Sequence, residues 1–166
     1  MMFLNSPIDI KTLWRETRNI FLAGDTSRRL YLNGVRAFRS LMLMGMLRNR
    51  GTLNGVRLLK AETVDLMTHN HFDGDMENMG AANFSGLDWG GIGFGLGFSV
   101  VLDPKRVGYG NKGIYGWSGA ASTYFWVDPV ADLIAIFFTQ FMPSGTYTIR
   151  SDLRPLVYSA LALKSF

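Results

Sequence analysis

Residues 115–129, Tyr-Gly-Trp-Ser-Gly-Ala-Ala-Ser-Thr-Tyr-Phe-Trp-Val-Asp-Pro, form the stretch that decides how this chain folds. Small residues lead into bulky apolar ones, which predicts a strand entrance that continues into a buried strand. A turn is expected at Asp128-Pro129, and a second apolar run, Leu133 to Phe138, follows it. Glycine and alanine in a strand usually mark a place where a ligand or another backbone comes close. The stretch therefore predicts a bulky hairpin with an accessible mouth.

The composition is that of a folded chain of 166 residues, which is enough for one domain with a real core. Hydrophobic residues make up 48% and charged residues 18%, which argues against disorder. Because cysteine is absent, disulfides and thiolate chemistry are excluded. No apolar run approaches the roughly 18 residues that a membrane helix needs, and the first residues do not resemble a signal peptide. We therefore expect a cytoplasmic protein without a membrane span.

The net charge of +4 is unevenly distributed along the chain. Residues 1–60 hold 11 Lys/Arg and 3 Asp/Glu, whereas residues 61–166 hold 6 and 10. A basic arm can attract nucleic acid or an anionic membrane, and such binding would weaken steeply with salt. However, the arginines flank the apolar run Leu41-Met42-Leu43-Met44 and do not share a polar helical face. A solvated surface is favoured, and no nucleic-acid partner is expected.

The order of elements predicts an α+β fold. Helices come first, then three antiparallel strands in a meander, and then a closing C-terminal helix. Asn54-Gly55 predicts a tight turn between short apolar pieces, and a loop is expected from Lys105 to Ile114. The helices are expected over residues 8–22, 36–49, 61–69 and 149–163, and the first strand over Phe94–Leu102.

Two patterns invite a cofactor interpretation, and neither holds. His69 and His71, followed by Asp73, Asp75 and Glu77, are acceptable metal ligands, but their spacing fits no closed zinc pattern. The glycines of Gly91–Gly97 do not match G-x-G-x-x-G, and they enter a strand instead of opening a helix. Their alternation with bulky residues predicts a strand with one bare face, against which something lies flat. We expect no metal and no cofactor.

Three segments together resemble the serine β-lactamase-like superfamily, in particular its esterase branch, the family VIII carboxylesterases and class C β-lactamase-related proteins. The same segments are also similar to those of penicillin-binding proteins. The segments cover residues 51–166 and are Gly51–His71, which includes Asn-Gly-Val-Arg-Leu-Leu and Thr-Val-Asp-Leu-Met-Thr, Gly93–Phe98, and Tyr115–Pro129 with the following Asp132-Leu133-Ile134-Ala135.

The resemblance implies a hydrolase that acts through an acyl-serine intermediate. In such proteins S-x-x-K supplies the nucleophile and a proton acceptor, Y-x-N supplies a tyrosine base, and a third motif lies on a strand beside the site. Trp117-Ser118-Gly119 matches the third motif in its esterase form, W-x-G. By resemblance, the backbone N–H of Ala120 would be an oxyanion-hole donor. No serine of the chain lies in G-x-S-x-G. A catalytic pair of Ser118 or Ser122 with a histidine is therefore not supported by any sequence motif.

The chain departs from the family pattern in its first half. No S-x-x-K is present, and Tyr31-Leu32-Asn33 fits Y-x-N only by its letters, because it stands about twenty residues before the Leu58-Leu59 region. We therefore interpret residues 1–166 as a single incomplete domain, with an atypical basic helical lead over 1–50 and a β-lactamase-like C-terminal part over 51–166. With only three strands, one sheet edge should be left unpaired, which favours self-association.

Two functions remain open. The first is the C-terminal part of an ester or amide hydrolase of small molecules, inactive alone because its nucleophile is absent. The second is a non-enzymatic binding or oligomerisation module that uses the open sheet edge and an aromatic groove. Trp117, Tyr124 and Trp126 would supply the anchors of that groove.

Overall fold

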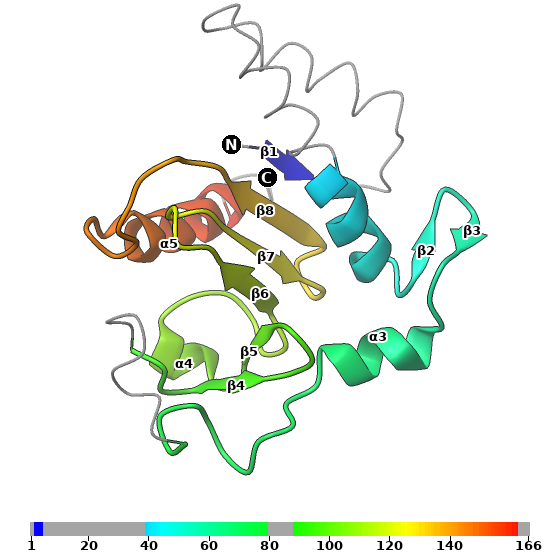
Figure 1. The fold of residues 1–166 in the computed structure, drawn as a ribbon, viewed down its shortest axis with the longest axis horizontal. Coiled ribbons are helices and arrows are strands. Elements are labelled where there is room, and N and C mark those ends of the chain that lie inside the picture. The colour runs from blue at the N-terminus through cyan, green and yellow to red at the C-terminus, as the bar shows by residue number, and fades with distance from the viewer. Residues whose placement is uncertain (1, 5–38, 80–87, 163–166) are drawn as a thin grey trace, which may run out of the picture.

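The computed structural model describes residues 2–4, 39–79 and 88–162 of the chain (Figure 1). Its centre is a six-stranded antiparallel sheet with the strand order β1-β8-β7-β6-β5-β4. The α+β class and the closing helix are confirmed. The elements are β1 (Met2–Leu4), a helix over 39–48, β2 (Thr52–Leu53), β3 (Val56–Arg57), α3 (Ala61–Met67), β4 (Ile92–Phe94), β5 (Ser99–Val101), α4 (Pro104–Val107), β6 (Tyr115–Ser118), β7 (Tyr124–Asp128), β8 (Leu133–Phe137) and α5 (Ile149–Ala162).

The prediction of three strands is wrong, because two of the expected long strands are each folded into a hairpin. The first reverses between β4 and β5, where the Gly95 N–H donates to the Phe98 carbonyl at 2.8 Å and Gly97 has φ +89°. The second reverses between β6 and β7, where Ser122 has φ +61°. Small or left-handed residues at both reversals let the backbone turn where an uninterrupted strand would need extended geometry.

The two faces of the sheet are buried by different helices. The helix over 39–48 and α3 pack against alternate residues such as Tyr115 and Val127, whereas α5 packs against Trp126 and its neighbours. Trp126 is only 1% exposed. Since side chains alternate across a strand, β7 contributes to both cores at once. Figure 1 shows α5 on one side of β6–β8 and the 39–48 helix on the other.

Strand β8 does not lie at the edge of the sheet, which corrects the expectation based on three strands. β1 pairs with β8 in the register Met2↔Ile136. Along β4, the His71 N–H donates to the Phe94 carbonyl at 2.9 Å and the Met76 N–H donates to the Ile92 carbonyl at 2.7 Å. Self-association through an open edge stays a prediction without support from this geometry.

Shorter elements agree with the sequence in part. The Asn54-Gly55 turn joins β2 to β3 as expected, with both residues at positive φ. The expected loop after Asp103 instead begins with α4, because the Asp103 carboxylate caps the Lys105 and Arg106 N–H groups. Among the described helices, none has the length and apolar character that crossing a membrane requires. The expected helix over 8–22 lies outside the described residues.

Candidate functional site

The connection between β6 and β7 is a three-residue hairpin loop. The Gly119 N–H donates to the Thr123 carbonyl at 2.8 Å, and the Ser122 N–H donates to the Gly119 carbonyl at 3.1 Å. Ser122, with φ +61°, occupies the left-handed position that closes such a loop. The Ser122 hydroxyl donates to the Phe141 carbonyl at 2.9 Å, which fastens the loop to the chain ahead of α5. This loop presents Ala120 at its first central position.

The end of β6 is open on the side that faces β5. β5 pairs only with Tyr115 and Gly116, so the last two residues of β6 have no strand partner on that side. Because Gly119 bonds toward β7, the ladder alternation directs the backbone groups of Ser118 toward the open side. Ala120 is exposed, and no oxygen of residues 2–4, 39–79 or 88–162 accepts a hydrogen bond from its N–H. The loop therefore carries a backbone donor that is available to a ligand.

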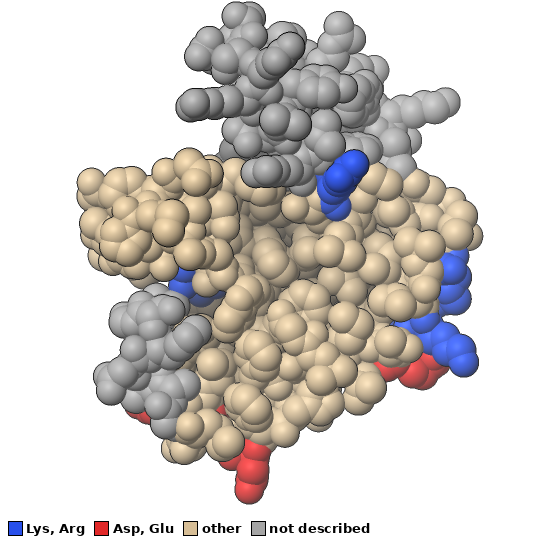
Figure 2. All heavy atoms as spheres, in the orientation of Figure 1, with Lys and Arg blue, Asp and Glu red and all other residues tan. Residues whose placement is uncertain are grey.

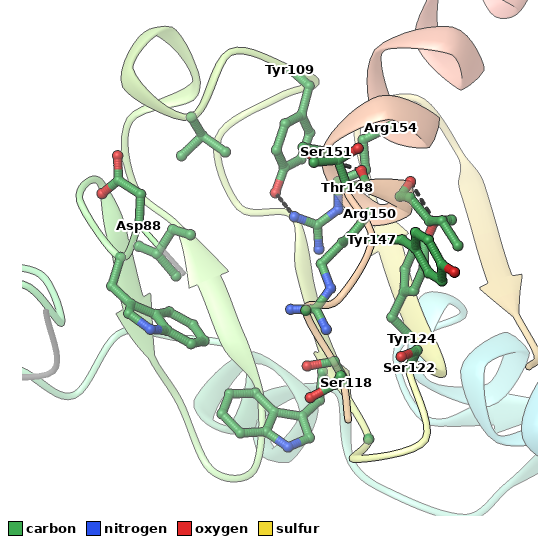
Figure 3. A pocket seen from close by; sticks show the side chains of 18 of the residues that line it. Asp88, Tyr109, Ser118, Ser122, Tyr124, Tyr147, Thr148, Arg150, Ser151 and Arg154 are labelled. Carbon is green, nitrogen blue, oxygen red and sulfur yellow. Dashed lines mark hydrogen bonds between the residues drawn. The ribbon is translucent and has the colours of Figure 1, made fainter. Parts of the chain in front are cut away.

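A pocket of about 570 Å³ adjoins this donor (Figure 3). Its walls come from the chain before β4, from α4 and its following loop, from the β6–β7 hairpin, and from residues 144–155. Figure 2 shows basic atoms set back in the hollow beside α5. The structure brings all four residues of the expected third motif to this pocket, namely Trp117, Ser118, Gly119 and Ala120.

One wall of the pocket is aromatic. The Trp117 ring stacks on Trp89 with centroids 6.0 Å apart, and it meets the edge of Phe94 at 5.2 Å. Trp89 is 5% exposed, so it forms a firm support for the half-buried Trp117. The sequence analysis did not predict Trp89 as a pocket residue. The available indication was an isolated tryptophan that is followed by Gly-Gly-Ile-Gly at the end of an otherwise polar loop. The wall suits an apolar or planar part of a ligand.

The opposite wall is basic and phenolic, and sequence reasoning missed it as well. Arg150 and Arg154 lie one helical turn apart on α5 and both line the pocket. The Arg154 Nη1 donates to the Tyr109 hydroxyl at 2.5 Å, and its guanidinium lies 4.7 Å from the Tyr109 ring centroid. The Arg150 guanidinium lies 5.7 Å from the centroid of Tyr124. In Figure 3 both arginines point from α5 into the pocket, and Arg150 extends toward Ser118. Their i, i+4 spacing was the available signal.

Neither the tyrosines nor the histidines of the described residues supply this pocket with a base near neutral pH, and the carboxylate that lines it is that of Asp88, whose Oδ1 accepts from the Gly90 N–H at 2.9 Å. Burial raises the pKa of Tyr124 to about 12, and burial likewise raises the pKa of Tyr109 although the charge of Arg154 opposes it. Neither histidine lines the pocket, and the His71 Nε2 contacts the Leu66 carbonyl at 2.8 Å. A phenol with such a pKa stays neutral and donates hydrogen bonds. The pocket can bind and polarise a ligand, and its described lining offers one carboxylate, Asp88, as a proton acceptor.

Other expected residues fall elsewhere. Tyr31 and Asn33, the Y-x-N match, lie outside the described residues. Among the residues that the structure describes, no cluster of three or more potential metal ligands occurs. Of the three proposed aromatic anchors, Trp117 and Tyr124 line the pocket, although Tyr124 is only 3% exposed, whereas Trp126 is 1% exposed, does not line the pocket and belongs to the core beneath α5.

Comparison with known proteins agrees with the fold and with the resemblance. The family model described as Beta-lactamase matches residues 33–158, which confirms the resemblance to the β-lactamase-like superfamily. Protein Rv1367c of Mycobacterium tuberculosis (strain ATCC 25618 / H37Rv) is 38% identical over 108 residues, which cover 62% of this chain and 26% of the relative. An uncharacterized protein, MT1414, of the strain CDC 1551 / Oshkosh matches equally. The chain spans about a quarter of the length of these curated relatives.

Two solved structures share the fold. Simvastatin synthase (LovD) from Aspergillus terreus, in its LovD6 mutant form, aligns with a TM-score of 0.58 at 24% identity, over 73% of this chain and 33% of that one. EstCE1, a hydrolase with promiscuous acyltransferase activity, aligns with a TM-score of 0.55 at 23% identity, over 70% of this chain and 28% of that one.

Proposed function

Because the chain belongs to the Beta-lactamase family, we propose that its pocket is one side of an acyl-transfer site that hydrolyses esters of small molecules. Trp117, Ser118, Gly119 and Ala120 form the third-motif side of that site. The observation that carries the proposal is the exposed Ala120 N–H, which has no acceptor in the described part of the chain and stands at the mouth of the pocket.

The role of Ala120 follows from the charge that develops during acyl transfer. Attack on an ester carbonyl places negative charge on its oxygen, and a fixed N–H aimed at that oxygen stabilises it by roughly 3 kcal/mol. The hairpin holds this N–H in place through the Gly119–Thr123 bond and the Ser122–Phe141 bond. A donor fixed before the reaction needs no reorganisation when the charge forms.

Trp117 sets the preference for esters over β-lactams. In β-lactamases the third motif begins with lysine, whose charge holds the carboxylate of the β-lactam. Here an indole fills that position and is packed between Trp89 and Phe94, so the position offers apolar contact without charge. An acyl or alkoxy group of an ester gains from that contact.

The nucleophile is supplied from outside the 166 residues, because no S-x-x-K occurs among them. In this proposal residues 1–166 form a single incomplete domain, and the serine and lysine come from a segment such as the one that the longer relatives have room for. EstCE1, a hydrolase with promiscuous acyltransferase activity, shares the fold, which supports acyl transfer as the reaction class. Alone, the chain binds ligands without turning them over.

The first test uses the chain alone. We expect no release of p-nitrophenol from p-nitrophenyl butyrate above the buffer rate, and no acyl adduct by mass spectrometry. A burst of p-nitrophenol together with a trapped acyl-protein would contradict the absence of a nucleophile.

The second test restores the missing side. In Protein Rv1367c, the matched 108-residue segment is replaced by the corresponding segment of this chain, and hydrolysis of p-nitrophenyl esters and nitrocefin is compared with that of the unaltered relative. We expect both proteins to release p-nitrophenol from p-nitrophenyl butyrate, and we expect the chimaera to favour this ester over nitrocefin. A folded chimaera that hydrolyses nitrocefin faster would overturn the ester assignment.

A further inference from the structure

The aromatic wall of the pocket depends on a short segment directly before β4. Trp89 lines the pocket, is 5% exposed and stacks on Trp117 with an angle of 30° between the ring planes. The two glycines that follow Trp89 are buried, and the Asp88 Oδ1 accepts from the Gly90 N–H at 2.9 Å. The position of the Trp89 ring therefore depends on what holds Gly90 and Gly91.

The backbone of Gly91 is fixed from two sides. Its N–H donates to the Asp75 Oδ2 at 2.8 Å. Its carbonyl accepts from the Leu102 N–H at 2.8 Å and from the Asp103 N–H at 3.1 Å. The chain after Trp89 is therefore tied both to the loop that holds Asp75 and to the residues that lead into α4.

The side chain of Arg106 completes this support at Gly90. A Cβ added at Gly90 would overlap the Arg106 guanidinium, so the guanidinium lies directly against the Gly90 backbone, and only a residue without a side chain allows that approach. The same guanidinium is paired with the Glu77 carboxylate at 2.5 Å. Figure 1 shows α4 beside β4. Arg106 thus joins α4 to the segment that carries Glu77, at the residue next to Trp89.

This wall suits an uncharged aromatic ring. Figure 3 shows Asp88, the residue before Trp89, on the side of the pocket away from Arg150. The charge of Arg106 is balanced by Glu77. Aromatic rings attract one another beyond the apolar area that they bury, whereas a saturated ring of similar size gains only from the buried area. A rigid pair of stacked indoles therefore favours a planar aromatic group over a puckered aliphatic one.

We propose that Trp89 and Trp117 form a subsite for an uncharged aromatic ring of the ligand, and that Arg106, through Gly90, positions Trp89 for it. Trp89 is the specificity-determining residue and Arg106 is a positioning residue. This inference deepens the proposed function, on which it rests for naming the ligand as a substrate. It assigns the substrate class as esters that carry an aromatic ring in the acyl part or in the alcohol part.

Binding to the whole chain tests the subsite without turnover. Dissociation constants are measured by NMR from the backbone N–H signals of Ser118 and Gly119, for two matched pairs of uncharged esters. Methyl benzoate is compared with methyl cyclohexanecarboxylate, and phenyl acetate with cyclohexyl acetate. We expect the aromatic ester of at least one pair to bind about fivefold more tightly than its saturated counterpart. The first pair reports a ring in the acyl part, and the second pair reports a ring in the alcohol part.

Variants assign this preference to the proposed residues. With Trp89→Leu we expect the preference to fall to about twofold or less. Arg106→Ala releases the Gly90 backbone and should reduce the preference in the same direction, while affinity for the saturated esters changes by less than about twofold; a general loss of structure would weaken both classes of ester. Arg50→Ala breaks the comparable exposed ion pair with Asp65 away from the pocket and should leave the preference unchanged. Circular dichroism establishes that each variant is folded.

Gly90→Ala is a gentler variant, because the atoms nearest to its added Cβ all belong to the Arg106 guanidinium, the end of a flexible side chain. We expect it to reduce the aromatic preference in the unaltered chain and to have no further effect in an Arg106→Ala chain. Additive losses in this cycle, or an unchanged preference in a folded Arg106→Ala chain, overturn the positioning role. Equal affinities within both ester pairs overturn the subsite. An aromatic preference in a chain whose chimaera turns over no ester supports the subsite and removes the acyl-transfer proposal alone.

Discussion

The two hairpins built from glycine-containing segments have opposite outcomes. In the β4–β5 hairpin the bare backbone is covered by the chain itself, because the Leu96 N–H donates to the Met67 carbonyl at 2.9 Å and an added Cβ at Gly95 would overlap that same carbonyl. In the β6–β7 hairpin Gly119 and Ala120 are exposed, and within the described structure the Ala120 N–H has no acceptor.

The comparison separates two uses of small residues in strands. At β4–β5 they allow one segment of the chain to lie flat on another, and Asn70 seals the contact by accepting from the Phe94 N–H at 2.9 Å. At β6–β7 they keep space for something that the described chain does not provide. A glycine in a strand therefore indicates that other atoms come close to its backbone. Whether those atoms belong to the same chain or to a ligand distinguishes packing from binding.

The largest expected effect concerns the exposed donor. Ala120 occupies the first central position of its turn, where proline is accepted, so Ala120→Pro removes the N–H with little change of backbone. In the chimaera we expect kcat for p-nitrophenyl butyrate to fall by about 100-fold to 1,000-fold, which corresponds to the loss of one oxyanion-hole donor. Ala120→Gly is the matched control, because it removes the methyl group as a side-chain change while it keeps the N–H at this position. An unchanged kcat in a folded Ala120→Pro chimaera would remove Ala120 from the mechanism.

The next effect concerns stability and tests the comparison directly. Gly95→Ala places a Cβ against backbone atoms of Met67 and His69, which cannot rotate away, and should lower the free energy of unfolding by about 3 kcal/mol. Gly119→Ala brings a Cβ to 2.6 Å from the Thr123 Oγ1, a side-chain atom that can turn aside, and should cost less than about 1 kcal/mol. Urea titrations of the two variants measure the difference. Equal losses would show that both glycines serve packing.

A smaller effect concerns the aromatic wall. Trp117→Lys in the chimaera restores a cation beside the pocket and removes the stacking on Trp89. We expect the ratio of nitrocefin turnover to p-nitrophenyl butyrate turnover to rise by about tenfold, the equivalent of one charge-assisted contact. Trp117→Phe keeps an aromatic ring and should leave this ratio near its original value. A ratio that does not respond to lysine would contradict the role assigned to Trp117.

The smallest effect is a dependence of stability on alkaline pH. Burial raises the pKa of Tyr124 from its ordinary value of 10 to about 12, so the folded chain holds this proton more tightly than the unfolded chain does. The stability that comes from this group is complete below pH 10 and is lost as the pH rises toward 12. Tyr124→Phe should flatten the fall of the melting temperature over that interval. The exposed Tyr147, as Tyr147→Phe, should leave the fall unchanged, and the reverse order would refute the assignment.

The sequence predicted the family, the closing helix and the position of Trp117-Ser118-Gly119 beside a pocket, because local apolar patterns and a specific motif carry that information. It did not predict the reversals within 94–102 and 115–127, since alternating glycines suit both a bare strand face and a turn, and the choice depends on which backbone arrives. Arg150 and Arg154 were missed for a related reason. Two arginines four residues apart usually lie on a solvated helix face, and here the way α5 packs on the sheet turns them into the pocket.

The bond from the Ser122 hydroxyl to the Phe141 carbonyl, together with the one from the Phe141 N–H to the Ala121 carbonyl at 3.2 Å, joins two parts of the pocket rim. Because residues 144–148 follow Phe141 closely and lead into α5, these two bonds connect that segment to the β6–β7 turn. A substitution in residues 144–148 that alters ligand binding should therefore also alter the position of Ala120, and with it the turnover of the chimaera.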